Sequence, residues 1–153
     1  MVDVRNISKL QFDNLFDCLK GDKLSKYLLF NIESSYGIFY NEKLIGLLEY
    51  EMCFNQISIN LALLDKFRGN GYSLLALNKF VEKYGKEFNE FKKFLCLVNP
   101  NNYSANRSLE KSDWIITIEY DETMLYEGGS FHKIYYKNNP YYVEKRLLKD
   151  DKK

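Results

Sequence analysis

An apolar run that leads through a glycine-containing turn into an amphipathic segment constrains this chain most. Residues 56–64 (QISINLALL) end almost wholly in apolar residues, which predicts a buried central strand. Residues 73–87 carry apolar side chains at helical spacing. Between them, Gly69 and Gly71 permit backbone angles that direct successive amides into a nest at the start of the helix. Such a site favours an anion, and a diphosphate is the obvious ligand.

The loop is not one of the two common nucleotide-binding loops. It lacks the Gly-Lys-Ser/Thr ending of a Walker loop. It also lacks the third glycine of a dinucleotide-binding turn, and three predicted strands precede it. A tight strand-to-helix turn needs glycine for its own geometry, so the loop alone leaves a structural role open.

The other periodicities predict the fold class. Further strands are expected at 36–40, 44–53, 93–98, 114–120 and 131–137, and further helices at 8–20, 22–33 and 103–112. With an opening strand, the order is β-α-α-β-β-β-α-β-α-β-β. This order predicts an α/β fold (α+β in its mixed sheet) of about six or seven strands with helices on both faces. A ligand is then expected at the carboxyl ends of the central strands. We expect one domain over 1–142 and a charged tail over 143–153 that frays.

Charge and composition exclude several classes of function. The 22 basic and 21 acidic residues give a net charge of +1, which argues against nucleic acid and anionic membranes as partners. The chain has no apolar run of ~18 residues and no evident signal peptide. The single histidine, His132, and the absence of a Cys-x-x-Cys pair argue against a metal site.

Three scattered cysteines are typical of reduced thiols in a cytoplasmic protein. Cys96 lies within an apolar run and Cys53 next to one, so both are expected to be buried structural thiols. Cys18 completes the set.

A second motif follows the strand at 93–98. Residues 102–114 read NYSANRSLEKSDW. Together with residues 68–73 (RGNGYS), this segment resembles the GNAT (Gcn5-related) N-acetyltransferase family. That family's acyl-CoA loop reads Arg/Gln-x-x-Gly-x-Gly/Ala, and Ser73 takes its last place. The later family pattern is Asn-x-x-Ser/Ala, then aromatic-Glu-Lys-x-Gly-Phe. It is matched by Asn102, Ala105, 110–111 and Trp114, whereas Asp113 replaces the usual glycine. The resemblance covers about residues 1–137.

The resemblance implies acetyl-CoA as cosubstrate, with no metal. The backbone amides expected to hold its pyrophosphate are those of Arg68, Gly69, Asn70, Gly71, Tyr72 and Ser73. The backbone of Leu63 and Leu64 would pair with pantetheine and polarise the thioester carbonyl. Asn102 would contact the pantetheine arm beside Ala105. Asn102 is equally a good helix N-cap, so that role stays open.

The catalytic groups are less clearly marked. An amine acceptor with a pKa of ~10.4 is protonated at pH 7, so a proton acceptor is needed. Glu49 and Glu51 share one face of the strand beside the cofactor strand and could serve through water, or they could simply be solvated. Many family members place a tyrosine, the usual proton donor to the thiolate, where this chain has Leu109. The acid would then be Tyr103, Tyr136 or water.

Two functions remain open from sequence. The first is an N-acetyltransferase that transfers acetyl from acetyl-CoA to a primary amine by direct attack in a ternary complex. Its acceptor would be an amine-bearing small molecule or peptide, and carboxylates at Glu49, Glu51, Glu119 and Asp121 would suit a cationic one. The second is a catalytically inactive acyl-CoA-binding or protein-interaction module. Residues 135–142 could also form an edge-strand contact in a homodimer.

Overall fold

The computed structural model describes residues 1–19, 31–98, 102–117 and 133–144. Within them, one mixed sheet has the order β1-β2-β3-β4-β5-β7-β6. Its strands are β1 (Val2–Arg5), β2 (Ser35–Tyr40), β3 (Lys43–Cys53), β4 (Gln56–Leu63), β5 (Lys93–Val98), β6 (Ile115–Ile116) and β7 (Lys133–Asn138). Only the central pair of described strands, β4 and β5, runs parallel. The prediction of a central buried strand at 56–64 is confirmed.

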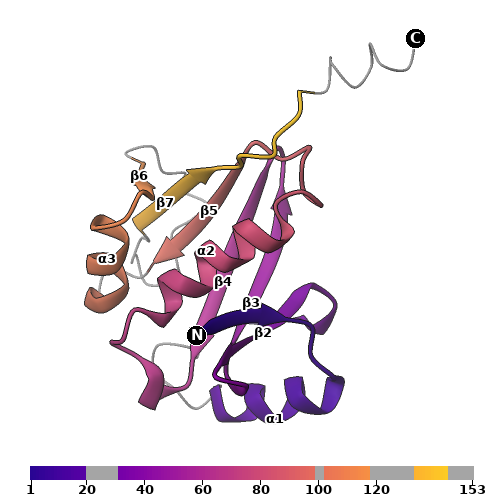
Figure 1. Cartoon of the computed structure of the whole chain (residues 1–153), viewed down its shortest axis with the longest axis vertical. Helices are drawn as coiled ribbons and strands as arrows, with labels where there is room; N and C mark the ends of the chain where they lie inside the picture. Colours follow the sequence, from indigo (N-terminus) through magenta and orange to yellow (C-terminus); the bar gives the residue numbers. More distant parts are fainter. Residues whose placement is uncertain (20–30, 99–101, 118–132, 145–153) are drawn as a thin grey trace, which may run out of the picture.

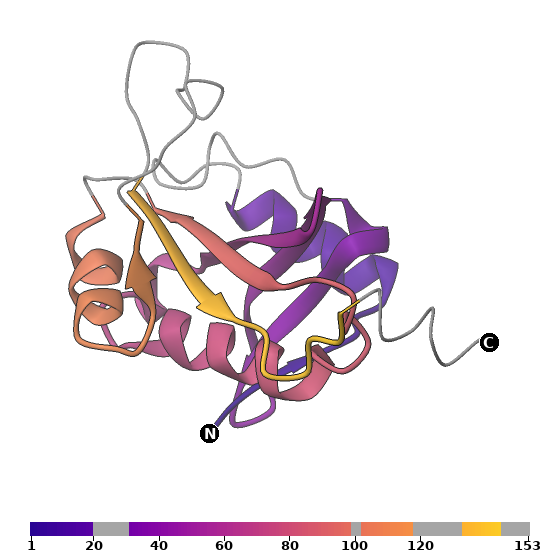
Figure 2. The ribbon, with the colours of Figure 1, turned by 90° about the horizontal axis from the view of Figure 1, so that it is seen from above.

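Helices cover both faces of the sheet, as predicted (Figures 1 and 2). The helix α1 (Lys9–Leu19) packs on the face that carries Leu47 and Ala62. The longer helix α2 (Tyr72–Tyr84) packs on the opposite face, where it forms the main core with Leu48 and other apolar residues. The short helix α3 (Tyr103–Glu110) contributes to that same core through Leu109.

Local sequence explains where α1 begins. Ser8 and Gln11 form a capping box: the Gln11 N–H donates to the Ser8 hydroxyl at 3.1 Å, and the Ser8 N–H donates to the Gln11 side chain at 2.9 Å. The helix then buries Phe12, Leu15 and Leu19, which lie at three- and four-residue spacing on one face. This is the helix expected at 8–20.

The chain passes from β2 to β3 through a two-residue hairpin turn. Asn41 and Glu42 have φ values of 47° and 71°, and Lys43 already belongs to β3. Two consecutive left-handed residues match the right-handed twist of the flanking strands, which is why Asn is favoured there.

Some predicted elements differ in the structure. The helix expected at 22–33 is not continuous to its end, because Ile32–Ser34 form a 3-10 turn (η1) capped by Asn31. The strand expected at 114–120 is described only as Ile115–Ile116. The segments 20–30 and 118–132, with Glu119, Asp121 and His132, lie outside the described residues. Cys96 is buried as expected, whereas Cys53 is exposed at the end of β3, so that prediction was wrong.

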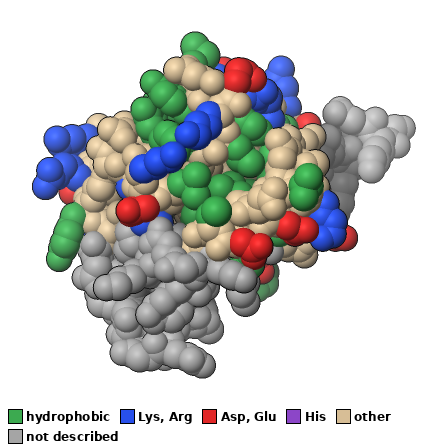
Figure 3. Space-filling model, turned by 90° about the horizontal axis from the view of Figure 1, so that it is seen from below, with side chains coloured by type: hydrophobic (Ala, Val, Ile, Leu, Met, Phe, Trp, Pro, Cys, Tyr) green, Lys and Arg blue, Asp and Glu red, His purple; other side chains and the backbone are tan. Residues whose placement is uncertain are grey.

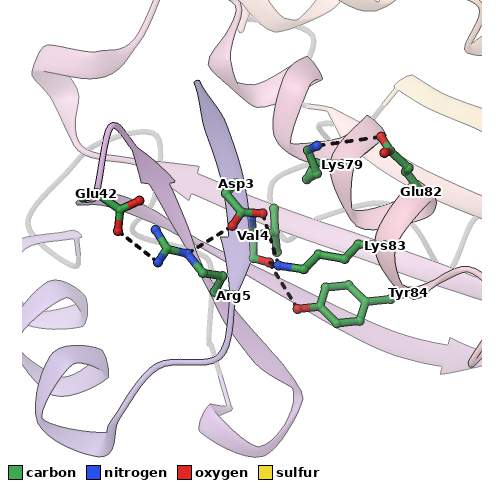
Figure 4. A network of polar contacts seen from close by, with 8 residues as sticks. All are labelled: Asp3, Val4, Arg5, Glu42, Lys79, Glu82, Lys83 and Tyr84. Carbon is green, nitrogen blue, oxygen red and sulfur yellow. Dashed lines mark hydrogen bonds and ion pairs between the residues drawn. The ribbon is translucent and has the colours of Figure 1, made fainter.

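A polar network fixes the edge strand β1 to the end of α2 (Figure 4). The Lys83 ammonium donates to the Val4 carbonyl at 2.8 Å and lies 3.2 Å from the Asp3 carboxylate. The Tyr84 hydroxyl donates to the same carbonyl at 3.1 Å, and Arg5 also pairs with Asp3 at 3.1 Å. Partial burial raises the pKa of Asp3, but hydrogen bonds from Lys83 and Val4 and the two cations outweigh it, so its pKa is lowered.

A buried asparagine joins the end of β7 to the turns after α2. The Asn139 amide donates to the carbonyls of Gly85, Phe88 and Phe91 at 3.0–3.2 Å, and its oxygen accepts from the Tyr141 N–H at 3.0 Å. The residue is only 4% exposed. The Gly85 and Phe88 carbonyls also accept from the N–H groups of Phe88 and Phe91, at 3.2 and 2.9 Å. The Asn139 side chain therefore reinforces these turns and adds partners for the Phe91 carbonyl and the Tyr141 N–H.

We therefore expect Asn139→Ala to lower the free energy of unfolding by about 2–4 kcal/mol, because it removes four hydrogen bonds of a buried side chain, including those to the Phe91 carbonyl and the Tyr141 N–H. Asn138→Ala is the matched control at an exposed neighbouring position; it should change stability by less than about 0.5 kcal/mol. Urea unfolding of both variants measures the difference. Equal effects would show that the network contributes nothing specific.

Candidate active site

The two parallel strands separate where they end. β3 pairs with all of β4, from Gly46↔Leu63 to Cys53↔Gln56. In contrast, β5 pairs with β4 only from Gln56↔Lys93 to Ile59↔Cys96. Beyond Ile59, no described residue of β5 pairs with β4, and the two strands diverge toward their carboxyl ends (Figure 1). The last residues of β4 therefore have an edge that no described strand pairs with.

The register shows which backbone groups lie on that edge. The Leu64 N–H donates to the Ile45 carbonyl at 2.8 Å, so residue 64 points its peptide groups toward β3. Because hydrogen-bonded positions alternate along an antiparallel pair, the peptide groups of Leu63 and Leu61 point the other way, toward β5. The Leu64 carbonyl also has a partner, the Phe67 N–H at 2.9 Å. Both backbone groups of Leu64 are therefore engaged within the protein, and Leu61, rather than Leu64, lies with Leu63 on the edge that faces β5.

The loop after β4 forms the start of α2 without a side-chain cap. A 3-10 turn, η2 (Asp65–Phe67), leads into Gly69 and Gly71, whose φ values are 81° and 78°. Gly71 is the N-cap and accepts from Leu75 at 3.3 Å, but no side chain caps the first N–H groups of the helix. These groups, with the helix dipole, make an anion site of the first turn.

The two glycines leave the space above the loop open. A Cβ built on Gly69 or Gly71 meets no atom within 4 Å. Neither residue is therefore a glycine because a neighbour crowds it; what requires glycine here is the left-handed backbone. The amides of Asn70, Tyr72 and Ser73 belong to the same turn, so the donor set suits a phosphate group.

The Arg68 side chain forms polar contacts with the end of β4 and with the start of this loop. Its guanidinium donates to the Leu63 carbonyl at 3.0 Å and lies 3.3 Å from the Asp65 carboxylate. Burial lowers the pKa of Arg68, yet arginine stays charged in proteins. The side chain thus joins the end of β4 to the start of the loop, rather than lying exposed on the loop.

Asn102 is the N-cap of α3. Its side-chain oxygen accepts from the Ala105 N–H at 3.3 Å, and its carbonyl accepts from the Asn106 backbone and side chain at 3.1 and 2.9 Å. The capping role that sequence left open is thus present. The cap uses only the oxygen of the amide, and the half-buried side chain keeps its nitrogen as a donor.

Glu49 and Glu51 share one face of β3, as predicted, but differ in burial. Their cross-strand partners on β4 are Asn60 and Ser58. Glu49 is 8% exposed and accepts a short hydrogen bond from the Asn31 N–H, whereas Glu51 is exposed. Burial raises the pKa of Glu49, partly offset by the Asn31 hydrogen bond, and the charge of Glu51 raises it further. Sequence could not have found Asn31, which lies 18 residues away.

The candidate acid Tyr103 and the position where the family has its tyrosine lie in opposite environments. Tyr103 begins α3 with 74% of its surface exposed. Leu109, where the resemblance places a tyrosine, is 2% exposed within the main core. The position of the usual tyrosine is thus filled by an apolar side chain that stabilises α3 against the sheet.

No family model and no curated protein matches the sequence. Solved structures do match. RimL, a ribosomal L7/L12 alpha-N-protein acetyltransferase, has 17% identity and a TM-score of 0.66, over 90% of this chain and 93% of that chain. A GNAT-family acetyltransferase from Bacillus anthracis has 16% identity and a TM-score of 0.65, over 88% and 92%. A chimera of the spermidine N-acetyltransferase SpeG from Vibrio cholerae and hSSAT has 13% identity and a TM-score of 0.69, over 90% and 95%. The chain therefore has the fold of the GNAT acetyltransferases, as its motifs predicted.

Proposed function

We propose that this chain is a GNAT acetyltransferase that transfers the acetyl group of acetyl-CoA to a primary amine. One observation carries the proposal. The uncapped N-terminus of α2, with two left-handed glycines before it, lies beside the point where β4 loses its β5 partner. A helix N-terminus binds phosphate, and an unpaired strand edge binds an amide-containing arm. Coenzyme A carries both groups in one molecule.

In this proposal, the amides from Arg68 to Ser73 hold the pyrophosphate. Gly69 and Gly71 let it approach the backbone, because no Cβ stands in the way. Arg68 acts by holding the loop against the Leu63 carbonyl, and its charge adds to the positive potential of the first turn.

The unpaired edge of β4 would hold the pantetheine arm and the thioester. Leu61 offers an N–H and a carbonyl toward β5, and Leu63 offers an N–H. An N–H aimed at the thioester oxygen stabilises the negative charge that develops as the amine attacks. The Asn102 amide nitrogen and the neighbouring Ala105 would line the other side of the arm, at the start of α3.

Glu49 is our candidate for the group that accepts the proton of the amine. Its buried position and raised pKa make it a better base at neutral pH than an ordinary carboxylate. Glu51, two residues along the same face, would attract a cationic acceptor or take the proton itself through water. Direct attack within a ternary complex needs no nucleophilic side chain. The leaving thiolate would take its proton from Tyr103 or from water.

The acceptor is proposed only by class. RimL is named for acetylating a protein and SpeG for acetylating spermidine, so both peptides and small amines are acceptors on this fold. The acidic face of β3 favours a cationic amine, small or peptide-borne. That the protein is cytoplasmic and binds neither nucleic acid nor membrane remains a prediction. No described helix is long and apolar enough to span a bilayer.

A homodimer through residues 135–142 remains a prediction. β6 pairs with Tyr135 and Tyr136, so this part of β7 is not an edge. Within that range, a dimer contact would use the residues that follow β7.

The inactive acyl-CoA-binding module remains the alternative, and one observation favours it. The buried Leu109 removes the proton donor that the family resemblance leads one to expect. Binding of acetyl-CoA without turnover of any amine would support this second function.

A turnover assay distinguishes the acetyltransferase from the inactive acyl-CoA-binding module. With acetyl-CoA and a panel containing spermidine and short peptides, we expect thiol release that depends on an amine. Glu49→Gln should lower kcat by about 10²–10⁴-fold, the usual contribution of a general base. Glu82→Gln, an exposed carboxylate on the far side of α2, should have no effect. A larger loss in Glu51→Gln would move the role to that residue. No amine-dependent release from the wild type would contradict the enzyme proposal.

Tyr103→Phe tests the acid in the same assay. If Tyr103 protonates the thiolate, kcat falls; if water does so, kcat is unchanged and the variant remains fully folded, since the side chain is exposed.

Stability against pH tests the burial of Glu49 without any substrate. A carboxyl whose pKa is higher in the folded state binds more protons there, so the wild type loses stability as pH rises from about 4.3 through the raised pKa. Glu49→Gln removes that loss. Urea unfolding between pH 4 and 8 should therefore show that the free energy of unfolding of Glu49→Gln increases relative to that of the wild type as pH rises. A constant difference, or the opposite slope, would contradict the raised pKa.

A further inference from the structure

Two lysines converge on one aromatic ring beside the proposed pyrophosphate loop. The ammonium groups of Lys43 and Lys66 each lie 5.3 Å from the centre of the Phe67 ring. Lys43 begins β3, and Lys66 belongs to the turn η2, so the pair is assembled from two separate segments. The contact brings two like charges together, and attraction to the ring offsets only part of their repulsion.

The carboxylates next to these lysines in sequence are engaged elsewhere. Glu42 pairs with Arg5 at 3.1 Å, and Asp65 pairs with Arg68 at 3.3 Å. Among the described residues, neither lysine forms an ion pair with an acidic side chain. The neighbouring Lys66 ammonium lowers the pKa of Lys43, and slight desolvation adds to this effect. The pair is thus a concentrated positive site with no internal anion.

The loop and the hairpin turn are held together at this point. Tyr40, which pairs with Lys43 across the turn, stacks on Tyr72, the first residue of α2, with ring centres 4.7 Å apart. Phe67 directly precedes Arg68, the first residue of the loop, and the four residues from Phe67 to Gly71 can span at most ~14 Å. The loop after β4 and the hairpin turn between β2 and β3 both lie at the lower end of the molecule in Figure 1. Figure 3 views that end and shows basic side chains beside hydrophobic ones.

We propose that Lys43 and Lys66 together bind a phosphate monoester, the 3′-phosphate of the coenzyme A whose pyrophosphate lies on the adjacent loop. The proposal rests on the proposed function. A dianion between two ammonium groups relieves their repulsion and forms a charge-assisted hydrogen bond with each. The two phosphate sites would then be divided between backbone amides, for the pyrophosphate, and side-chain cations, for the monoester.

Binding of acetyl-CoA and its 3′-dephospho analogue tests this directly. By calorimetric titration, we expect the wild type to bind acetyl-CoA about tenfold more tightly than its 3′-dephospho analogue. This ratio is equivalent to about 1.4 kcal/mol in binding free energy. In the double variant Lys43→Met/Lys66→Met, the two ligands should bind about equally, because methionine keeps the packing on Phe67 but not the charge. Each single variant should lose part of the discrimination.

Lys86→Met is the matched control. Lys86 also lies over an aromatic ring, 5.5 Å from the centre of Tyr141, but beyond the far end of α2. This variant should keep the full preference for the 3′-phosphate.

The outcomes separate the two proposals. If the wild type binds neither ligand, the proposed function fails and this inference fails with it. If it binds both equally, or if the double variant keeps the preference, the lysine site is overturned while the acyl-CoA site stands. The comparison within the wild type needs no variant, so it decides the question even if a substitution harms folding.

Discussion

The structure depends on a strand that is fully paired on one side and half paired on the other. β4 pairs with β3 along its whole length but with β5 only as far as Ile59. Unpaired backbone groups inside a sheet are costly unless a ligand, water or side chain meets them. Arg68 meets one, at the Leu63 carbonyl. The remaining groups are the N–H and carbonyl of Leu61 and the N–H of Leu63. In the proposed function, the pantetheine arm forms hydrogen bonds with them.

The same divergence brings the loop into position. β4 ends at Leu63, and within a few residues the chain turns through two left-handed glycines into α2, on the opposite face from α1. Only residues 64–71 separate the strand edge from the uncapped helix end, and Arg68 within them is hydrogen-bonded to the Leu63 carbonyl. On the other face of β3, the buried Glu49 is held by Asn31. Cofactor and proton acceptor are thus proposed to lie on either side of the central strands.

Sequence predicted the features that depend on composition and spacing. The apolar run of β4, the glycines of the loop and the stripe of α2 each indicate their structure locally. It could not assign hydrogen-bond direction, because a one-residue change of register moves the open edge from Leu61 and Leu63 to Leu64. Nor could sequence predict that Glu49 and Glu51 differ in burial and hydrogen bonding. Both lie on the same face of β3, and the distant Asn31 forms its hydrogen bond with Glu49. The inward turn of the Arg68 side chain likewise depends on the tertiary position of the Leu63 carbonyl.

Thermal unfolding with and without acetyl-CoA tests the central claim most directly, since it requires neither turnover nor a known acceptor. A ligand at about 100 times its dissociation constant stabilises the folded state by about 2.7 kcal/mol. For a chain of this size, the account predicts a rise of roughly 5–10 °C in Tm. An unchanged Tm with acetyl-CoA, coenzyme A and longer acyl-CoAs would contradict it, because the open strand edge and the helix N-terminus would then hold no such ligand.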